Sequence, residues 1–197
     1  MPRGEHRNDR RVRRTKKLLV QALTQLMSEK QVNEITVKEL TQLADVNRCT
    51  FYLYYSDIYD MLHTTQNELL AALEDIAGRH RENSARGELS PMLEELFEHI
   101  GQNSEMWRVL LSPTGDMSFL HRLNQLLRES FSWMQSVGET PRGAAEWDFR
   151  YSFGVFGCAG LIRSWLDSGL NESPSHMAAL TDSLLRQGVL AIVDGKK

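Results

Sequence analysis

The chain has 197 residues, of which 41% are hydrophobic, and a formal net charge of −3. This composition supports a sizeable core in one or two domains. The sequence contains no run of 18 apolar residues and no apolar stretch after the N-terminal charges, which argues against a membrane span and a signal peptide. Its two cysteines, Cys49 and Cys158, are far apart, so a structural disulfide is not expected. These features predict a cytoplasmic protein that does not contact a membrane.

The N-terminus is strongly basic. Eight Lys and Arg against two acidic residues occupy the first seventeen positions, and residues 1–60 carry net +3 against −6 for residues 61–197. A basic end on an acidic chain is typical of a localised contact with nucleic acid. We expect the part before Val12 to be disordered until it meets DNA. It could contact a groove specifically, or act only as a solvated, charged tail.

Two short helices are predicted after a first helix over residues 9–28. Thr36 is a suitable N-cap for the first short helix, and Glu39 three residues later completes a capping box. The apolar positions that follow recur at helical spacing. Asp45 then comes at a turn, where Asp tolerates the left-handed conformation better than most residues. Asn47 is the expected N-cap of the second short helix.

The second short helix has an inner and an outer face. Phe51 and Tyr55 lie four residues apart and should face inward. The outer side is predicted to carry Arg48, Cys49, Thr50, Tyr52 and Tyr54. Arg and Thr side chains can contact base edges, and Tyr hydroxyls can donate to phosphates. The segment therefore predicts a helix-turn-helix for the DNA major groove, although an ordinary helical corner is the alternative.

Residues 36–61 resemble the DNA-binding domain of the TetR family of bacterial transcription regulators. The resemblance rests on Thr36, the turn 45–47 and the run Thr50-Phe-Tyr-Leu-Tyr-Tyr55. It implies a DNA interface with phosphate contacts, base-edge contacts and a capping residue: Thr36, Lys38, Asn47, Arg48, Cys49, Thr50, Tyr52 and Tyr54. Asp45 stands where the family usually has Gly, and Ile58 where it often has a phosphate-binding Lys.

The rest of the chain is predicted to be helical, which makes the fold all-α. We expect a three-helix DNA-binding domain over 1–60 and a larger regulatory and dimerisation domain over 61–197. The last two helices, predicted over 144–168 and 175–193, resemble the pair through which this family forms homodimers. Gly154, Gly157 and Gly160 in the first of them indicate a close helix approach, either at that interface or within one subunit.

A signal bound by the C-terminal domain is implied by the family resemblance. Candidate ligand-binding residues are Trp107, Phe119, Phe131, Trp147 and Arg150, although aromatics also simply fill cores. The sequence shows no metal-ligand spacing, phosphate loop or nucleophile motif, so neither catalytic residues nor a cofactor is expected. We predict a DNA-binding regulator that acts on a palindromic operator as a repressor and is relieved by a small molecule. The alternatives are a regulator that answers to a protein partner and, less favoured, an all-helical enzyme.

Overall fold

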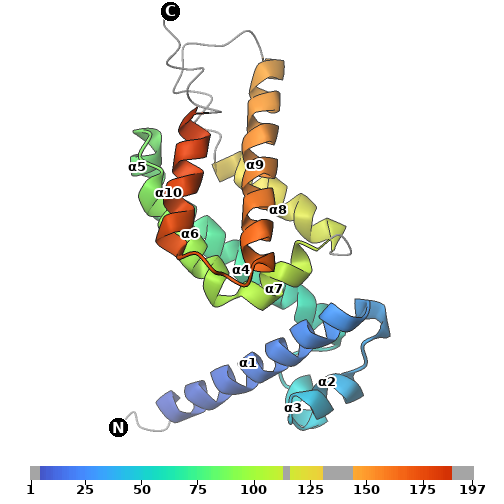
Figure 1. The fold of residues 1–197 in the computed structure, drawn as a ribbon. Helices are drawn as coiled ribbons and strands as arrows, with labels where there is room; N and C mark the ends of the chain where they lie inside the picture. The colour runs from blue at the N-terminus through green and yellow to red at the C-terminus, as the bar shows by residue number, and fades with distance from the viewer. Residues whose placement is uncertain (1–4, 113–115, 131–143, 188–197) are drawn as a thin grey trace, which may run out of the picture. The chain divides into compact units, whose positions relative to one another are not determined.

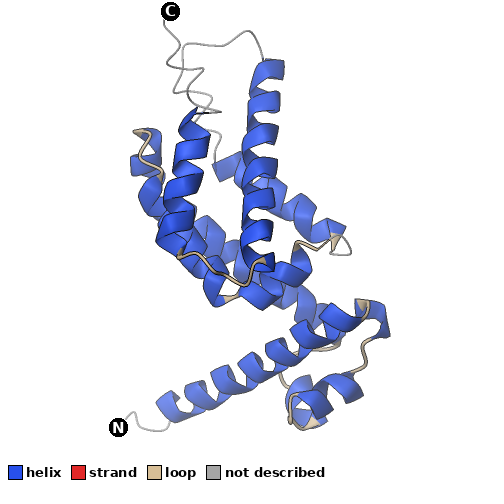
Figure 2. Ribbon diagram, viewed as in Figure 1, coloured by secondary structure: helices blue, strands red, loops and turns tan. Residues whose placement is uncertain are grey.

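The computed structural model describes residues 5–112, 116–130 and 144–187, and every regular element within these ranges is helical (Figures 1 and 2). The contacts divide the chain into two compact units, Met1–Leu69 and Leu70–Lys197. We call them the head and the body. The division falls within one long helix. In the ranges that are described, no helix combines the length and apolar character needed to cross a bilayer.

The head contains α1 (Glu5–Glu29), a 3₁₀ turn (Val32–Glu34), α2 (Val37–Leu43), α3 (Arg48–Tyr52) and the first half of α4 (Ile58–Arg79). Helix α1 contributes a buried stripe at helical spacing, comprising Leu19, Ala22, Leu23 and Leu26. It packs on α2, which in turn contacts α3. The predicted trihelical head is therefore confirmed, with Leu40 of α2 and Phe51 of α3 fully buried in its core.

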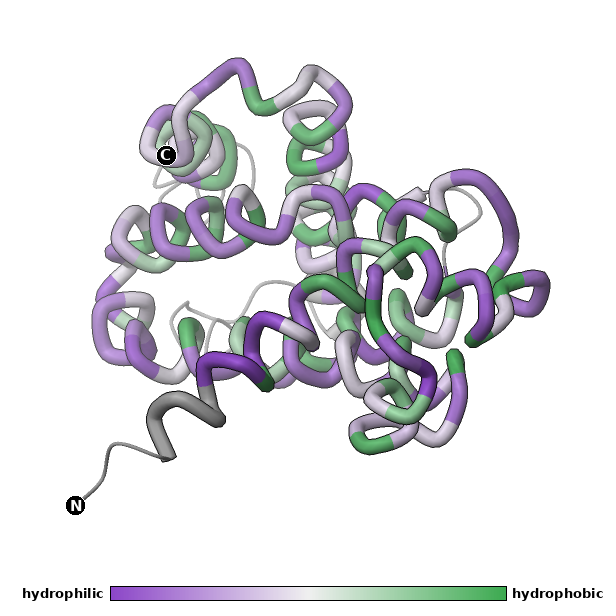
Figure 3. Tube along the Cα trace, turned by 90° about the horizontal axis from the view of Figure 1, so that it is seen from below, coloured by the Kyte–Doolittle hydropathy of each residue, from purple (hydrophilic) through white to green (hydrophobic). Residues whose placement is uncertain are grey.

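Helix α1 starts earlier than the sequence predicted. It begins at Glu5, so the expectation of a disordered arm before Val12 is wrong for the residues described. Arg and Lys are good helix formers, and this property outweighs the lack of apolar residues in the segment. The part of α1 that follows the grey N-terminal segment is drawn as largely hydrophilic in Figure 3. The basic charges are consequently carried on a helix.

The body comprises α5 (Arg81–Ala85), α6 (Ser90–Gln102), α7 (Ser104–Leu110), α8 (Met117–Ser130), α9 (Ala144–Asp167) and α10 (Pro174–Leu185). Helices α6 and α10 lie side by side and make its most extensive contact (Figure 1). The Trp165 ring meets Phe97 edge-on, with centroids 5.4 Å apart. A Cβ added at Gly101 would stand 3.3 Å from Trp165, so glycine permits this close packing.

The end of α9 is set by Gly169. This residue has φ +82°, and its N–H donates to the Leu166 carbonyl at 3.1 Å, while that of Leu170 donates to Trp165. This left-handed termination confirms the predicted helix stop. The chain then turns back through Ser173, whose hydroxyl caps α10 by accepting from the His176 N–H.

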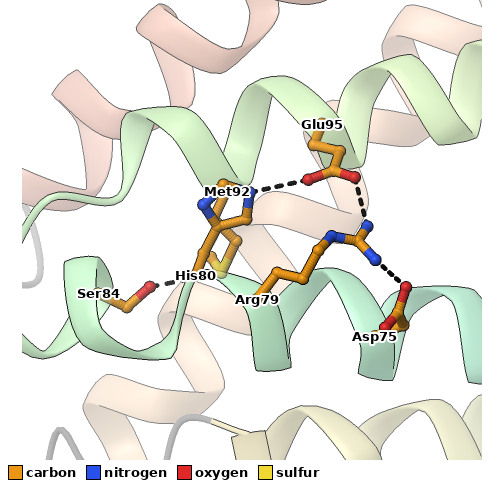
Figure 4. A network of polar contacts seen from close by, with 6 residues as sticks. All are labelled: Asp75, Arg79, His80, Ser84, Met92 and Glu95. Carbon is orange, nitrogen blue, oxygen red and sulfur yellow. Dashed lines mark hydrogen bonds and ion pairs between the residues drawn. The ribbon is translucent and has the colours of Figure 1, made fainter.

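A polar network joins the end of α4 to α6 (Figure 4). Arg79 bonds both Asp75 and Glu95, and the His80 Nε2 lies 2.8 Å from Glu95 Oε2. The hydrogen bonds from His80 and Arg79 lower the pKa of Glu95. Glu95 is thus held as the charged partner of two basic side chains at this corner of the body.

Candidate nucleic-acid interface

Helix α2 starts at Thr36. The Thr36 hydroxyl accepts the Glu39 N–H at 3.2 Å, as expected of an N-cap. The Glu39 side chain does not complete the predicted capping box, because both of its oxygens lie 2.6 Å from the Lys30 Nζ. An ammonium nine residues earlier outcompetes a backbone amide as a partner for the carboxylate. The pair instead ties the end of α1 to α2.

The turn between α2 and α3 depends on Asp45. Its φ is +52°, the left-handed conformation that the sequence predicted. The Val46 N–H donates to the Thr41 carbonyl at 3.0 Å, and the Asp45 N–H donates to Gln42 at 3.3 Å. This pair of bonds is a Schellman termination, which satisfies the last carbonyls of α2. The direction in which the chain enters α3 is therefore fixed by backbone bonds.

Helix α3 is held by a cap and two anchors. The Asn47 Oδ1 accepts the Cys49 N–H at 2.8 Å, which confirms the predicted cap. Phe51 is 0% exposed and Tyr55 is 4% exposed, so both face inward as predicted. Their ring centroids are 5.7 Å apart. Because one face of so short a helix is buried this completely, the opposite face is presented to solvent in a defined orientation.

The predicted contact residues of α3 and its C-terminal end differ in exposure. Arg48, Cys49 and Tyr52 are exposed, whereas Thr50 and Tyr54 are half-buried. Thr36, the N-cap of α2, and Lys38 within α2 are also exposed. A shallow open groove runs between the two helices, and it is lined by Lys38, Thr41, Gln42, Asp45, Val46, Asn47 and Arg48. The structure thus brings three of the eight predicted interface residues, Lys38, Asn47 and Arg48, together at one groove.

One basic residue joins this surface from α1. The Lys16 Nζ lies 6.0 Å from the ring centroid of Tyr54 and 5.9 Å from that of Tyr55. Such cation–π contacts hold an ammonium beside an aromatic ring. Ile58, which stands where the family often has a phosphate-binding Lys, is buried in the core. Lys16 is recognisable from the sequence only as part of the basic N-terminus, because nothing local indicates its contact with residues 38 and 39 positions later.

Tyr55 should titrate abnormally. Its burial, and then the nearby Glu68 and Asp60 carboxylates, raise its pKa from 10 to about 12. The folded state holds the Tyr55 proton more tightly than the unfolded state does. Its contribution to the free energy of unfolding, about 2–3 kcal/mol, is therefore fully present below pH 10 and is lost as the pH rises to 12. Phenolate absorbance at 295 nm should show one tyrosine that ionises near pH 12, and this titration step should be missing in Tyr55→Phe. A difference curve centred near pH 10 would contradict this.

The candidate ligand residues have different environments. Trp107 and Phe119 are buried and meet edge-on, with centroids 5.8 Å apart. The Trp107 Nε1 is buried without a hydrogen-bond acceptor among the described residues. Arg150 is half-buried on α9. Phe131 and the side chain of Trp147 lie outside the part of the chain that the structure describes. No group of three or more potential metal ligands occurs in the described ranges.

Helix α9 presents apolar side chains to solvent. Phe149, Phe153 and Phe156 are 75%, 66% and 67% exposed, and their spacing places them on one face. Gly160 continues this stripe, and a Cβ built there or at Gly157 would meet no described atom within 4 Å. The close approach that the glycines indicated is therefore not made at these two positions within the subunit. We call this stripe the α9 face.

Comparisons with known proteins agree with this architecture. Residues 87–187, just over half of the chain, match the TetR family model described as the transcriptional regulator C-terminal region. No curated protein matches. Among solved structures, the fatty acid degradation regulator FadR from Bacillus halodurans is similar, with 14% identity and a TM-score of 0.64 over 89% of this chain and 96% of that one. A TetR transcriptional regulator from Streptococcus agalactiae has 21% identity and a TM-score of 0.58 over 92% and 99%. The dihydroxyacetone kinase operon activator DhaS has 19% identity and a TM-score of 0.57 over 91% and 96%. The chain belongs to the TetR family of transcriptional regulators.

Proposed function

We propose that this regulator reads its operator with the outer face of α3. The observation that carries the proposal is the exposure of Arg48, Cys49 and Tyr52 on a helix that the buried Phe51 and Tyr55 hold in place. Arg48 suits the O6 and N7 atoms of guanine, and the hydroxyl of Thr50 suits a base edge. Asn47 caps the helix at the same end and orients these residues.

Phosphate contacts are assigned to the surroundings of α3. Thr36, the N-cap of α2, and Lys38, which lines the groove, are both exposed, and the hydroxyls of Tyr52 and Tyr54 can donate to phosphate oxygens. Lys16 supplies a cation next to Tyr54. We infer that it takes the place of the family's usual lysine at the position of Ile58. Such contacts set the register of the protein on the duplex without reading its sequence.

The functional unit is proposed to be a homodimer formed through α9 and α10. The three exposed phenylalanines of the α9 face, with Leu180 and Leu184 of α10, are too large an apolar set to remain in solvent without a partner. A two-fold axis makes the surface self-complementary and gives the DNA site a palindromic form. The two reading helices would then meet successive major grooves about 34–36 Å apart.

The body is proposed to hold the signal near Trp107 and Phe119. A buried indole N–H without an acceptor is a place where a ligand oxygen would be stabilised. The similar FadR of Bacillus subtilis, with 15% identity and a TM-score of 0.59, is in complex with stearoyl-CoA. We infer a cytoplasmic repressor released from DNA by such binding. The signal must bind the two states of the protein unequally to have this effect. A protein partner in place of the small molecule would be shown by DNA release that requires a second protein.

Selection of bound fragments from random duplex DNA with the purified protein tests the proposal. Recovery of one palindromic sequence supports a dimeric reader, whereas no enrichment at low salt would contradict it. On the recovered site, Arg48→Ala should weaken binding by about 1–3 kcal/mol and relax preference at one base position in each half-site. Arg81→Ala, in an exposed part of α5, removes the same charge and should leave the preference unchanged. If both variants changed affinity and base preference equally, Arg48 would not be a base-contacting residue.

A further inference from the structure

Leu53 is the most exposed of the large apolar side chains that the structure describes in the chain. It is 77% exposed and directly follows Tyr52, which is 58% exposed. Its backbone still has helical angles, φ −72° and ψ −21°, as the C-cap of α3. A position two residues after Phe51 is turned by about 200° on a helix, so Leu53 points away from the core in which Phe51 is buried. Its exposure follows from the geometry of α3 itself.

The backbone around Leu53 is fixed. The N–H groups of Tyr54 and Tyr55 both donate to the Phe51 carbonyl, at 2.9 and 3.0 Å. After the corner, the Ser56 N–H donates to the Asp60 carboxylate at 2.8 Å. Leu53 is therefore an apolar group held at a set place, and it lies one helical turn after the exposed Cys49 and next to Tyr52. A loop residue with free movement would not have such a fixed direction.

We propose that Leu53 recognises the 5-methyl group of a thymine in each operator half-site. The inference rests on the proposed function, which turns this side of α3 toward the major groove. Among base edges in that groove, the thymine methyl is the apolar feature. Arg48 on the same helix, and Lys16 of α1 beside the ring of Tyr54, the residue after Leu53, favour a polyanionic partner over an apolar protein surface. Leu53 thereby adds preference for thymine where Arg48 prefers guanine.

Replacing thymine by deoxyuridine tests the proposal, because this change removes the methyl group and keeps every hydrogen-bonding atom. Each thymine of the selected duplex is replaced in turn, symmetrically in both half-sites, and the Kd is measured for the wild-type protein. One position should weaken binding by about fourfold per half-site, the value of one buried methyl group. Leu53→Ala should bind the thymine duplex and the duplex with deoxyuridine at that position with equal Kd. Leu53→Met should retain most of the wild-type difference in Kd between them.

Leu43→Ala is the matched control, since Leu43 is also a partly exposed leucine of the head but lies on α2. It should keep the thymine preference of the wild type. The proposal is overturned if no deoxyuridine position weakens wild-type binding, or if Leu53→Ala still distinguishes the duplexes. It is also overturned if Leu53→Ala changes the association state of the protein without DNA, which would assign Leu53 to a protein contact. Failure of the wild type to select any site would instead refute the proposed function itself.

Discussion

Replacing Phe51 by alanine is expected to unfold the head while the body stays folded. The Phe51 side chain is fully buried, and its ring meets Tyr52 at 5.4 Å and Tyr55 at 5.7 Å. Truncating a buried phenylalanine costs about 3–5 kcal/mol, through lost burial and the cavity left behind. This is a large part of the stability of a small domain. Without the anchor, α3 cannot present its outer face, so operator binding should be lost.

The tryptophans of the sequence separate the unfolding of the body from that of the head. All four tryptophans follow Leu70 and thus report only on the body. In a urea titration, Phe51→Ala should lower the midpoint of part of the far-UV circular dichroism change and leave the tryptophan transition in place. Tyr52→Ala removes an adjacent but exposed ring and should change stability by at most about 0.5 kcal/mol. Similar destabilisation by both variants would mean that Phe51 does not anchor α3.

Replacing Phe153 by glutamate should convert the proposed dimer into monomers. The residue lies in the middle of the α9 face, between Phe149 and Phe156. A carboxylate buried there without a partner costs several kcal/mol, and two-fold symmetry places one on each side of the interface. Sedimentation equilibrium should show a dimer dissociation constant at least a hundredfold larger than that of the wild type. Operator affinity should fall with it, because each monomer holds only one half-site.

Gln102→Glu serves as the control for Phe153→Glu. It adds the same charge at an exposed position on α6. The control should sediment as the wild type does and keep its operator affinity. A dimer that persists in Phe153→Glu would place the interface elsewhere and leave the three phenylalanines to another partner. Loss of the dimer with unchanged operator affinity would instead argue against a two-half-site mode of binding.

Local signals were sufficient to predict much of the head. Thr36 and Asn47 act as caps, and Asp45 takes the left-handed conformation, because each depends on backbone atoms only a few residues away. Whether the Glu39 carboxylate accepts from the backbone or from Lys30 depends on how α1 and α2 pack, which the sequence does not show. The predicted capping box was therefore wrong. The contact of Lys16 with Tyr54 was missed for the same reason.

The body was harder to interpret from the sequence. Its helices were found from apolar spacing and from signals such as Gly169, which ends α9 as predicted. Burial alone does not separate a ligand-binding aromatic from a core aromatic. In the sequence, Trp107 and Phe119 are equally consistent with both roles. The ligand proposal for Trp107 depends instead on its buried indole N–H, which has no acceptor among the described residues. The exposure of Phe153 likewise follows from which face of α9 is covered, which periodicity alone does not show.

Asp45 does more than permit the turn before α3. Glycine would suit the same backbone conformation without a side chain, whereas aspartate adds a negative charge to a groove that Lys38 and Arg48 also line. A fixed anion at this place opposes part of the attraction between those cations and any DNA backbone. We expect the protein to spend less time on unrelated genomic DNA as a result, and to depend more on the bases it reads. A residue tolerated for its backbone thus limits how indiscriminately the head adheres to the chromosome.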